Sequence, residues 1–180
     1  MPSRAHRFAL VAHCHLNTNT KVHGLAGQPA MQSGLVRDLA ARDVGIIQLP
    51  CPEVTYLGMC RWGMTYEQYD TPAYRRHCRS VLVPVVDTVT ALIADGATLT
   101  GIWGADGSPS CAVTETCTGY PGGELEGPHT PATPPAAMRF PGRGVFFEEL
   151  GALLDAAGVD AAWFGLDERA GDGTAGLSMM

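Results

Sequence analysis

The sequence predicts an α/β fold of three layers, in which a mostly parallel sheet of about four strands carries helices on both faces. Short apolar runs rich in β-branched and aromatic residues alternate with longer segments whose apolar residues recur at helical spacing. Hydrophobic residues make up 46% and charged residues 17% of the 180 positions, which is enough apolar material for one sizeable core. We therefore expect a single domain over residues 1–180.

Four segments are predicted as strands, because each is a compact apolar run bounded by charged or turn-forming residues. In chain order they are Arg7–His13, Val44–Leu49, Thr98–Gly104 and Ala161–Gly165. Three segments between them have apolar residues at helical spacing and are predicted as helices. They are Ala30–Arg42, Thr71–Asp95 and Val145–Ala157.

Two residues are expected to interrupt or end these helices. Pro84 should kink the second helix, because proline removes a backbone N–H and clashes with the preceding turn. Gly158 is a C-terminal stop for the third helix. The alternation of strands and helices predicts right-handed crossovers, which bring the carboxyl ends of all strands to one edge. Ligands bind at that edge in open sheets of this kind.

One long segment has no periodicity. Residues 112–144 are rich in Gly and Pro, and we expect an irregular loop there, either a lid or a disordered stretch. The final residues, 169–180, are rich in Gly and Ala and are expected to fray.

Charge and hydropathy limit the partners. The formal net charge of −6 disfavours nucleic acid, and a small-molecule substrate is favoured. Arg75, Arg76 and Arg79 lie on a predicted helix and are expected to form a solvated face. No apolar run has the length of a membrane span, and the run at 8–12 is too short for a signal peptide. We expect a cytoplasmic protein without a membrane partner, and nothing in the sequence specifies an oligomeric state.

Three of the six cysteines follow the ends of predicted strands. These strand-end cysteines are Cys14, Cys51 and Cys111, which are 37 and 60 residues apart and lie in polar, turn-forming surroundings. If the strands are parallel, the three thiols meet at one edge of the sheet. In a reducing compartment, metal-binding or catalytic roles are favoured over disulfides. Cys78 lies on the apolar stripe of a helix and is expected to be a core residue.

Three thiolates are compatible with more than one metal centre. A structural zinc site needs four ligands, so a histidine such as His13 or His15 would have to join them. An iron–sulfur cubane with three cysteine ligands leaves one iron open to bind a substrate atom. Cys117 is a further candidate, either as a fourth ligand or as a sulfur acceptor. The spacing alone does not choose between these metals.

The segments around these cysteines resemble the signature segments of the thiouracil desulfidase family. They are His13–Asn17 (HCHLN), Gln48–Glu53 (QLPCPE) followed by Gly58, and Gly107–Cys111 (GSPSC). The likeness is closest to a branch of short, single-domain desulfidase relatives, whose C-terminal helix resembles Val145–Leu150. The chain differs from the founding members directly after the first cysteine, at residues 15–17.

The resemblance implies a [4Fe–4S] cluster with one open iron, and its ligands match Cys14, Cys51 and Cys111. It implies that Glu53 is the acidic residue near the substrate and that Ser108 and Ser110 are site residues flanking the third ligand. The implied activity is an iron–sulfur-dependent desulfidase that removes sulfur from a thiouracil-like thiocarbonyl compound. The expected reaction is hydrolytic and non-redox, with Glu53 as general base and sulfide as a product.

Other interpretations of the same residues stay open. Glu53 and the two serines are also suited to capping turns, and Asn17 to satisfying the backbone of its loop. Three aromatic residues after the second cysteine either form the wall of a pocket for a flat ring or pack in the ordinary way, and they are Tyr56, Trp62 and Tyr66. The alternative functions are a non-catalytic metal- or cluster-binding module and a persulfide carrier that uses a thiol such as Cys117.

Overall fold

The computed structural model describes residues 4–120 and 138–167. Its main sheet has four parallel strands in the order β2–β1–β3–β6. The strands are β1 (Arg7–Val11), β2 (Gly45–Gln48), β3 (Thr98–Ala105) and β6 (Trp163–Leu166). The predicted α/β class with a four-stranded parallel sheet is therefore confirmed.

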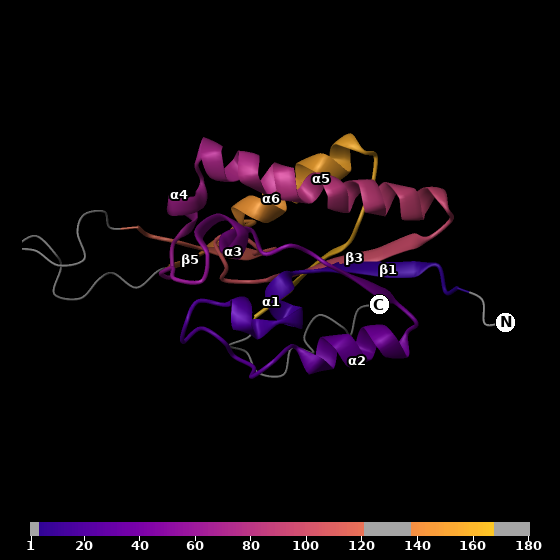
Figure 1. Cartoon of the computed structure of the whole chain (residues 1–180), viewed down its shortest axis with the longest axis horizontal. Helices are drawn as coiled ribbons and strands as arrows, with labels where there is room; N and C mark the ends of the chain where they lie inside the picture. The colour runs from indigo at the N-terminus through magenta and orange to yellow at the C-terminus, as the bar shows by residue number, and fades with distance from the viewer. Residues whose placement is uncertain (1–3, 121–137, 168–180) are drawn as a thin grey trace, which may run out of the picture.

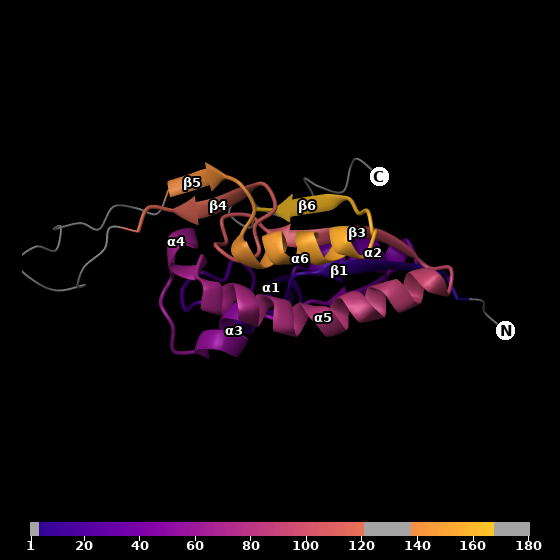
Figure 2. The same cartoon turned by 90° about the horizontal axis from the view of Figure 1, so that it is seen from above.

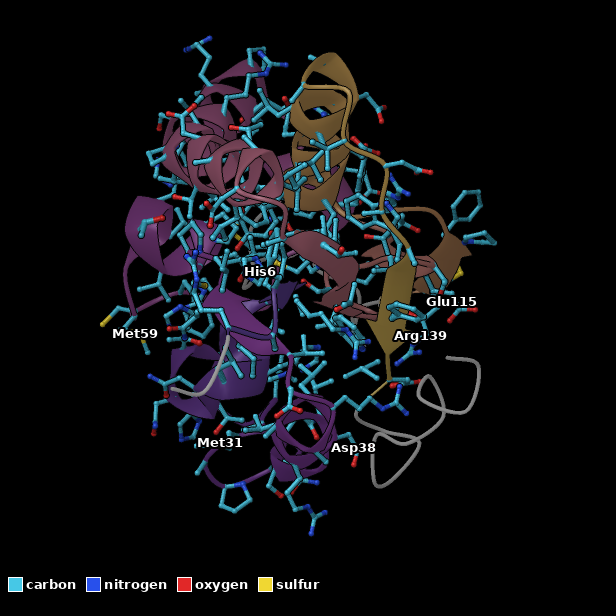
Figure 3. The ribbon with its side chains drawn as sticks, turned by 90° about the vertical axis from the view of Figure 1, so that its right-hand side faces the viewer. His6, Met31, Asp38, Met59, Glu115 and Arg139 are labelled. Carbon is cyan, nitrogen blue, oxygen red and sulfur yellow. The ribbon has the colours of Figure 1, made fainter. Side chains whose placement is uncertain are left out.

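Helices cover both faces of this sheet, and Figures 1 and 3 show the resulting three layers. Helix α2 (Ser33–Ala41) covers one face, while α5 (Pro72–Ala94) and α6 (Val145–Ala156) cover the other. Strand β1 supplies both cores because its side chains alternate. Phe8 and Leu10 belong to the larger core beneath α5 and α6, whereas Ala9 and Val11 belong to the smaller core beneath α2.

The strand order creates a switch point at the carboxyl edge. From β1 the chain passes through α2 to β2 on one side, and then through α5 to β3 on the other side of β1. A crevice therefore opens beyond the ends of β1 and β3, which is where open α/β sheets bind ligands. The segments that follow β1, β2 and β3 gather at the left end of the molecule in Figures 1 and 2.

Helix α5 continues through Pro84 as one element of 23 residues. Pro84 lies on its exposed side, away from the buried stripe that includes Tyr74, Cys78 and Leu82. The expected core position of Cys78 is confirmed, because this residue is fully buried. By length and composition alone, α5 is long and apolar enough to cross a membrane. It is the single helix among the described residues that meets these two criteria.

The arginines of α5 correct one expectation. Arg76 is exposed, whereas Arg75 and Arg79 both bind carboxylates of α6. Arg75 contacts Glu148 at 2.7 Å and Glu149 at 2.9 Å, and Arg79 also pairs with Glu149. The solvated interpretation was wrong for Arg75, which is 24% exposed, because α6 packs alongside α5, a tertiary contact that helical spacing does not reveal. Arg79 pairs with Glu149 but stays 54% exposed, so for this residue the solvated interpretation is confirmed.

Several short helices were not predicted. They are α1 (His13–Leu16), the 3-10 turn η1 (Thr18–Thr20), α3 (Pro52–Leu57) and α4 (Tyr66–Tyr69). Strand β1 ends at Val11, so His13 and His15 lie on a helical turn and do not alternate on a strand. These helices of one or two turns are too short to show apolar periodicity, but each begins directly at or near the carboxyl edge.

The prediction of an irregular loop over residues 112–144 was wrong at both ends of that segment. β4 (Glu115–Thr118) and β5 (Met138–Pro141) pair as an antiparallel hairpin. Glu115 and Arg139, labelled in Figure 3, lie diagonally on the two strands of this hairpin and form an ion pair at 3.4 Å. Residues 121–137 and 169–180 lie outside the described residues, so the lid and fraying expectations there remain predictions.

Candidate functional site

A cavity of about 480 Å³ opens at the carboxyl edge of the sheet. All three strand-end cysteines line it: Cys14 after β1, Cys51 after β2 and Cys111 after β3. Cys14 and Cys111 also pack against the larger hydrophobic core, so the floor of the cavity near them is apolar. The structure thus brings together thiols that are far apart in sequence.

Each of these thiols is fixed by backbone geometry at a strand end. Cys14 lies in the first turn of α1, and the amide of the preceding Ala12 donates to the Trp103 carbonyl of β3. Cys51 is the N-cap of α3 and is followed by Pro52 at the first helical position, where a missing N–H has no cost. Both residues are therefore held at the junction between a strand and a short helix.

The third thiol is held by its own loop and by α6. The Ser108 hydroxyl accepts hydrogen bonds from the amides of Ser110 (3.2 Å) and Cys111 (3.1 Å). The carbonyl of Cys111 accepts from the amide of Ala105 at the end of β3. An added Cβ at Gly104 would overlap with that carbonyl, so only glycine allows the loop to approach the strand this closely.

Burial favours the neutral form of the Cys51 and Cys111 thiols in the absence of a cation. The pKa of Cys111 is raised well above its ordinary value by burial and, to a lesser degree, by Cys14, Cys51 and Glu53. Burial also raises the pKa of Cys51. A metal cation among the three sulfurs would reverse this preference, because metal binding displaces thiol protons.

Glu53 lies on the cavity wall as half of an ion pair. Its Oε2 accepts a hydrogen bond from Nε of Arg61 at 3.1 Å, and the two side chains are 14% and 4% exposed. Arg61 also lines the cavity and donates to the carbonyls of Gly58 (3.2 Å) and Thr20 (2.5 Å). Sequence reasoning missed Arg61, because an arginine in a loop between exposed residues carries no signal of burial.

A buried tyrosine approaches Glu53 from α4. Tyr69 is 1% exposed, and its pKa is raised by burial and then by the charge of Glu53. Its ring packs against that of Tyr74, with 4.6 Å between the centroids. Glu53 is therefore flanked by a cation and by a neutral phenol.

The two predicted serines have different surroundings. Ser108 lines the cavity and also holds the Cys111 loop through the hydrogen bonds described above. Ser110 is fully buried, and its hydroxyl pairs with that of Tyr74 at 2.9 Å. It is not among the residues that line the cavity, so its geometry favours a role in holding the loop. Asn17 caps its own loop, as its side chain accepts from the Asn19 amide.

The remaining sulfur and imidazole groups divide between the cavity and the rest of the fold. Cys117, on β4, and His13 line the cavity, and burial lowers the pKa of His13. Cys60 is exposed, and His15 is buried elsewhere. The three aromatic residues proposed as a pocket wall do not line the cavity: Tyr56, Trp62 and Tyr66. Tyr66 instead donates to Glu148, and Trp62 is 77% exposed.

The candidate donor set consists of three thiols that line one cavity. Among residues 4–120 and 138–167, no group of three or more His, Cys, Asp or Glu side chains is arranged to hold one metal ion. In an iron–sulfur cubane each thiolate binds a different iron, so the sulfurs lie farther apart than the ligands of one ion. Cys111 is buried, Cys14 and Cys51 are half-buried, and all three line the cavity, so this donor set is compatible with ligands on different irons.

The comparisons with known proteins give little further information on function. The chain is 45% identical over 80 residues to an uncharacterized protein of Methanocaldococcus jannaschii. This match covers 44% of the chain and 51% of the relative, so the chain spans about half the length of that protein. No protein-family profile matches the chain. No solved structure matches it either.

Proposed function

We propose that this protein is an iron–sulfur-dependent desulfidase that hydrolyses the C=S bond of a small thiocarbonyl compound in the cytoplasm. The observation that carries the proposal is the meeting of three strand-end cysteines in one cavity that also contains an ion-paired carboxylate. The likeness of the three cysteine segments to the thiouracil desulfidase family points to the same chemistry. The substrate class is a thiouracil-like thio-base, and no nucleic-acid or membrane partner is proposed.

The strand-end cysteines would hold a [4Fe–4S] cluster. When bound, this group supplies an iron without a protein ligand, whose softness favours sulfur over oxygen. The cavity of about 480 Å³ has room for a small ring beside the thiols. Cys111 is the most buried of the three thiols, so its side of the cavity is the least accessible to water.

The carboxylate of Glu53 is proposed to move the protons. Its Oε2 is occupied by Arg61, so Oε1 is the oxygen left to take a proton from water. In the overall reaction the water oxygen forms a new C–O bond, the C–S bond breaks, and the two water protons leave with sulfide. The thiocarbonyl becomes a carbonyl, no electrons are transferred, and no redox partner is needed.

The test begins with anaerobic purification and measurement of iron, labile sulfide and the visible spectrum. We expect brown protein with about four irons per chain, and release of sulfide from a thiouracil. Substituting serine for any one of Cys14, Cys51 and Cys111 should remove most of the iron and all sulfide release. Full iron content and activity in all three variants would falsify the proposal.

Cys60 provides the matched control. It is an exposed cysteine nine residues after Cys51 and does not line the cavity. Cys60→Ser should keep the iron content, the spectrum and the rate of sulfide release. Iron loss in this variant as well would indicate nonspecific damage from serine substitution.

A second candidate function is favoured by Cys117, whose side chain lines the same cavity. In a persulfide carrier, this thiol would take the outer sulfur of a donor persulfide, which leaves as a thiol, and would pass that sulfur to an acceptor thiolate without hydrolysis. Cys117→Ser separates the two functions. A desulfidase with three cluster ligands keeps its iron and continues to release sulfide, whereas a carrier that works through Cys117 loses sulfur transfer and shows no cluster.

A further inference from the structure

We propose that Arg61 is the specificity-determining residue of the cavity and that it binds a carbonyl oxygen on the ring of the substrate. The inference rests on the proposed desulfidase function and narrows its substrate class. The preferred substrate is a planar thioamide heterocycle that carries a carbonyl group in addition to its C=S group.

The number of hydrogen-bond donors on Arg61 is the first argument. A guanidinium group has five N–H donors. Within the described residues Arg61 uses three of them, from Nε to Glu53, from Nη1 to the Gly58 carbonyl and from Nη2 to the Thr20 carbonyl. One N–H on each Nη nitrogen therefore has no acceptor in the described protein.

Burial makes these two donors significant. The side chain of Arg61 is 4% exposed, yet the residue lines the cavity. Buried polar groups are almost always hydrogen-bonded, since an unmade bond to a charged group is costly. Among the described residues, the cavity that Arg61 lines is the place for an acceptor, and a neutral carbonyl oxygen supplies one without adding a second buried charge.

The position of Arg61 suits recognition beside the reacting group. Its three protein contacts come from two segments, the turn ending at Thr20 and the α3 region from Glu53 to Gly58. The guanidinium is therefore fixed in place before any ligand binds, which reduces the entropy lost on binding. Its charge also acts on Cys51, so it lies close to the sulfur site.

The experiment compares two substrates that differ only in this carbonyl. 2-Thiouracil carries C=S and a ring carbonyl, whereas pyrimidine-2-thione carries only C=S. With the cluster-loaded enzyme we expect kcat/KM to be about 10- to 100-fold higher for 2-thiouracil. This ratio is the one expected when a hydrogen bond to a charged group is present for one substrate and absent for the other. Arg61→Met and Arg61→Lys should reduce this preference to within a few-fold of one.

Glu53→Gln is the matched control, because it changes the neighbour of Arg61 and leaves the guanidinium in place. This variant should lower kcat for both substrates while keeping their ratio. A purely structural role of Arg61 predicts the opposite pattern, with both rates lowered in the Arg61 variants and their ratio unchanged. That pattern overturns the inference.

A binding measurement without turnover separates this inference from the proposed function. Calorimetry with uracil and pyrimidin-2-one tests the same carbonyl in sulfur-free ligands. Tighter binding of uracil, lost in Arg61→Lys, supports the role of Arg61 even if no thio-base releases sulfide, an outcome that would refute only the desulfidase. Equal binding of the two ligands, or no binding of either, overturns the role of Arg61.

Discussion

Two clusters of arginine and glutamate in this protein have opposite designs. The interhelix cluster joins α5 to α6 through Arg75, Arg79, Glu148 and Glu149. The cavity pair consists of Arg61 and Glu53 at the carboxyl edge of the sheet. Both contain a carboxylate that is less than 15% exposed, yet their surroundings differ.

In the interhelix cluster the charged side chains are paired with one another. Arg75 alone contacts Asp70, Glu148 and Glu149 as well as the Tyr66 hydroxyl. In the cavity pair one arginine meets one carboxylate, and backbone carbonyls supply its other described acceptors. The first cluster therefore links two helices, whereas the second leaves more of its hydrogen-bonding groups without a charged protein partner, as the proposed ligand-binding role requires.

The largest expected effect on stability comes from removing the central carboxylate of the interhelix cluster. Glu149→Ala leaves Arg75 and Arg79 without their shared partner and should lower the free energy of unfolding by about 3 kcal/mol. Urea denaturation measures the loss. Iron content and sulfide release should not change at a temperature where the variant is folded. A loss of iron from the folded variant would contradict a purely structural role for the interhelix cluster.

The buried thiol below this cluster gives a pH dependence. Burial and Glu149 raise the pKa of Cys78 from 9.0 to about 12, so the folded chain keeps this proton when the unfolded chain loses it. The resulting stability is complete below pH 9.0 and is lost as the pH rises toward 12. The loss is up to about 1.4 kcal/mol per pH unit.

This pH effect is measured by urea denaturation between pH 8 and 10.5, with Cys78→Ala as the comparison. The variant should have a lower free energy of unfolding at pH 8 but a shallower decline above pH 9. Parallel curves for the two proteins would contradict the assignment to Cys78.

A smaller effect is expected at the cavity. Ser108→Ala removes the acceptor for the amides of Ser110 and Cys111, and should cost about 1 kcal/mol of stability. Because that loop carries the third thiol, iron should also be lost faster to a chelator. Ser80→Ala is the control, because it removes only an exposed hydrogen bond from the Ser80 hydroxyl to the His77 carbonyl on α5. This variant should leave the rate of iron loss unchanged.

The smallest effect belongs to the outer carboxylate of the interhelix cluster. Glu148 is 35% exposed, so Glu148→Gln should lower the free energy of unfolding by only about 0.5 kcal/mol. Raising the salt concentration should reduce the difference further. A cost similar to that of Glu149→Ala would show that exposure does not distinguish the two carboxylates.

The sequence was sufficient to predict the sheet, because its signals are local. Apolar runs and helical spacing identified four strands and three helices, and parallel connections then directed the strand-end cysteines to one edge. The hairpin of β4 and β5 was missed because its strands, ETCT and MRFP, are not apolar runs. The segment entering β4 is held by Asp106, which accepts from the amides of Val113 and Thr114.

The sequence predicted only those site residues that have a distinctive side-chain chemistry and directly follow a predicted strand. Cysteines are conspicuous at such positions, but the burial of Arg61 depends on Thr20, which is 41 residues away along the chain. The contact of Ser110 with Tyr74 is equally remote, at 36 residues. Long-range pairs of this kind leave no periodic pattern, so the wall of the cavity could not be derived from one sequence.

The contact between α6 and the third cysteine loop has a consequence for biosynthesis. The first amides of α6, at Val145 and Phe146, bind the carbonyls of Pro109 and Ser110, and Gly144 binds that of Ala112. A nascent chain that has reached residue 143 already contains every cysteine of the site, but the Cys111 loop then lacks the hydrogen bonds that α6 and Gly144 make to it. We therefore predict that the proposed cluster is inserted only after α6 has been translated, and that a chain truncated before that helix remains colourless despite its complete set of thiols.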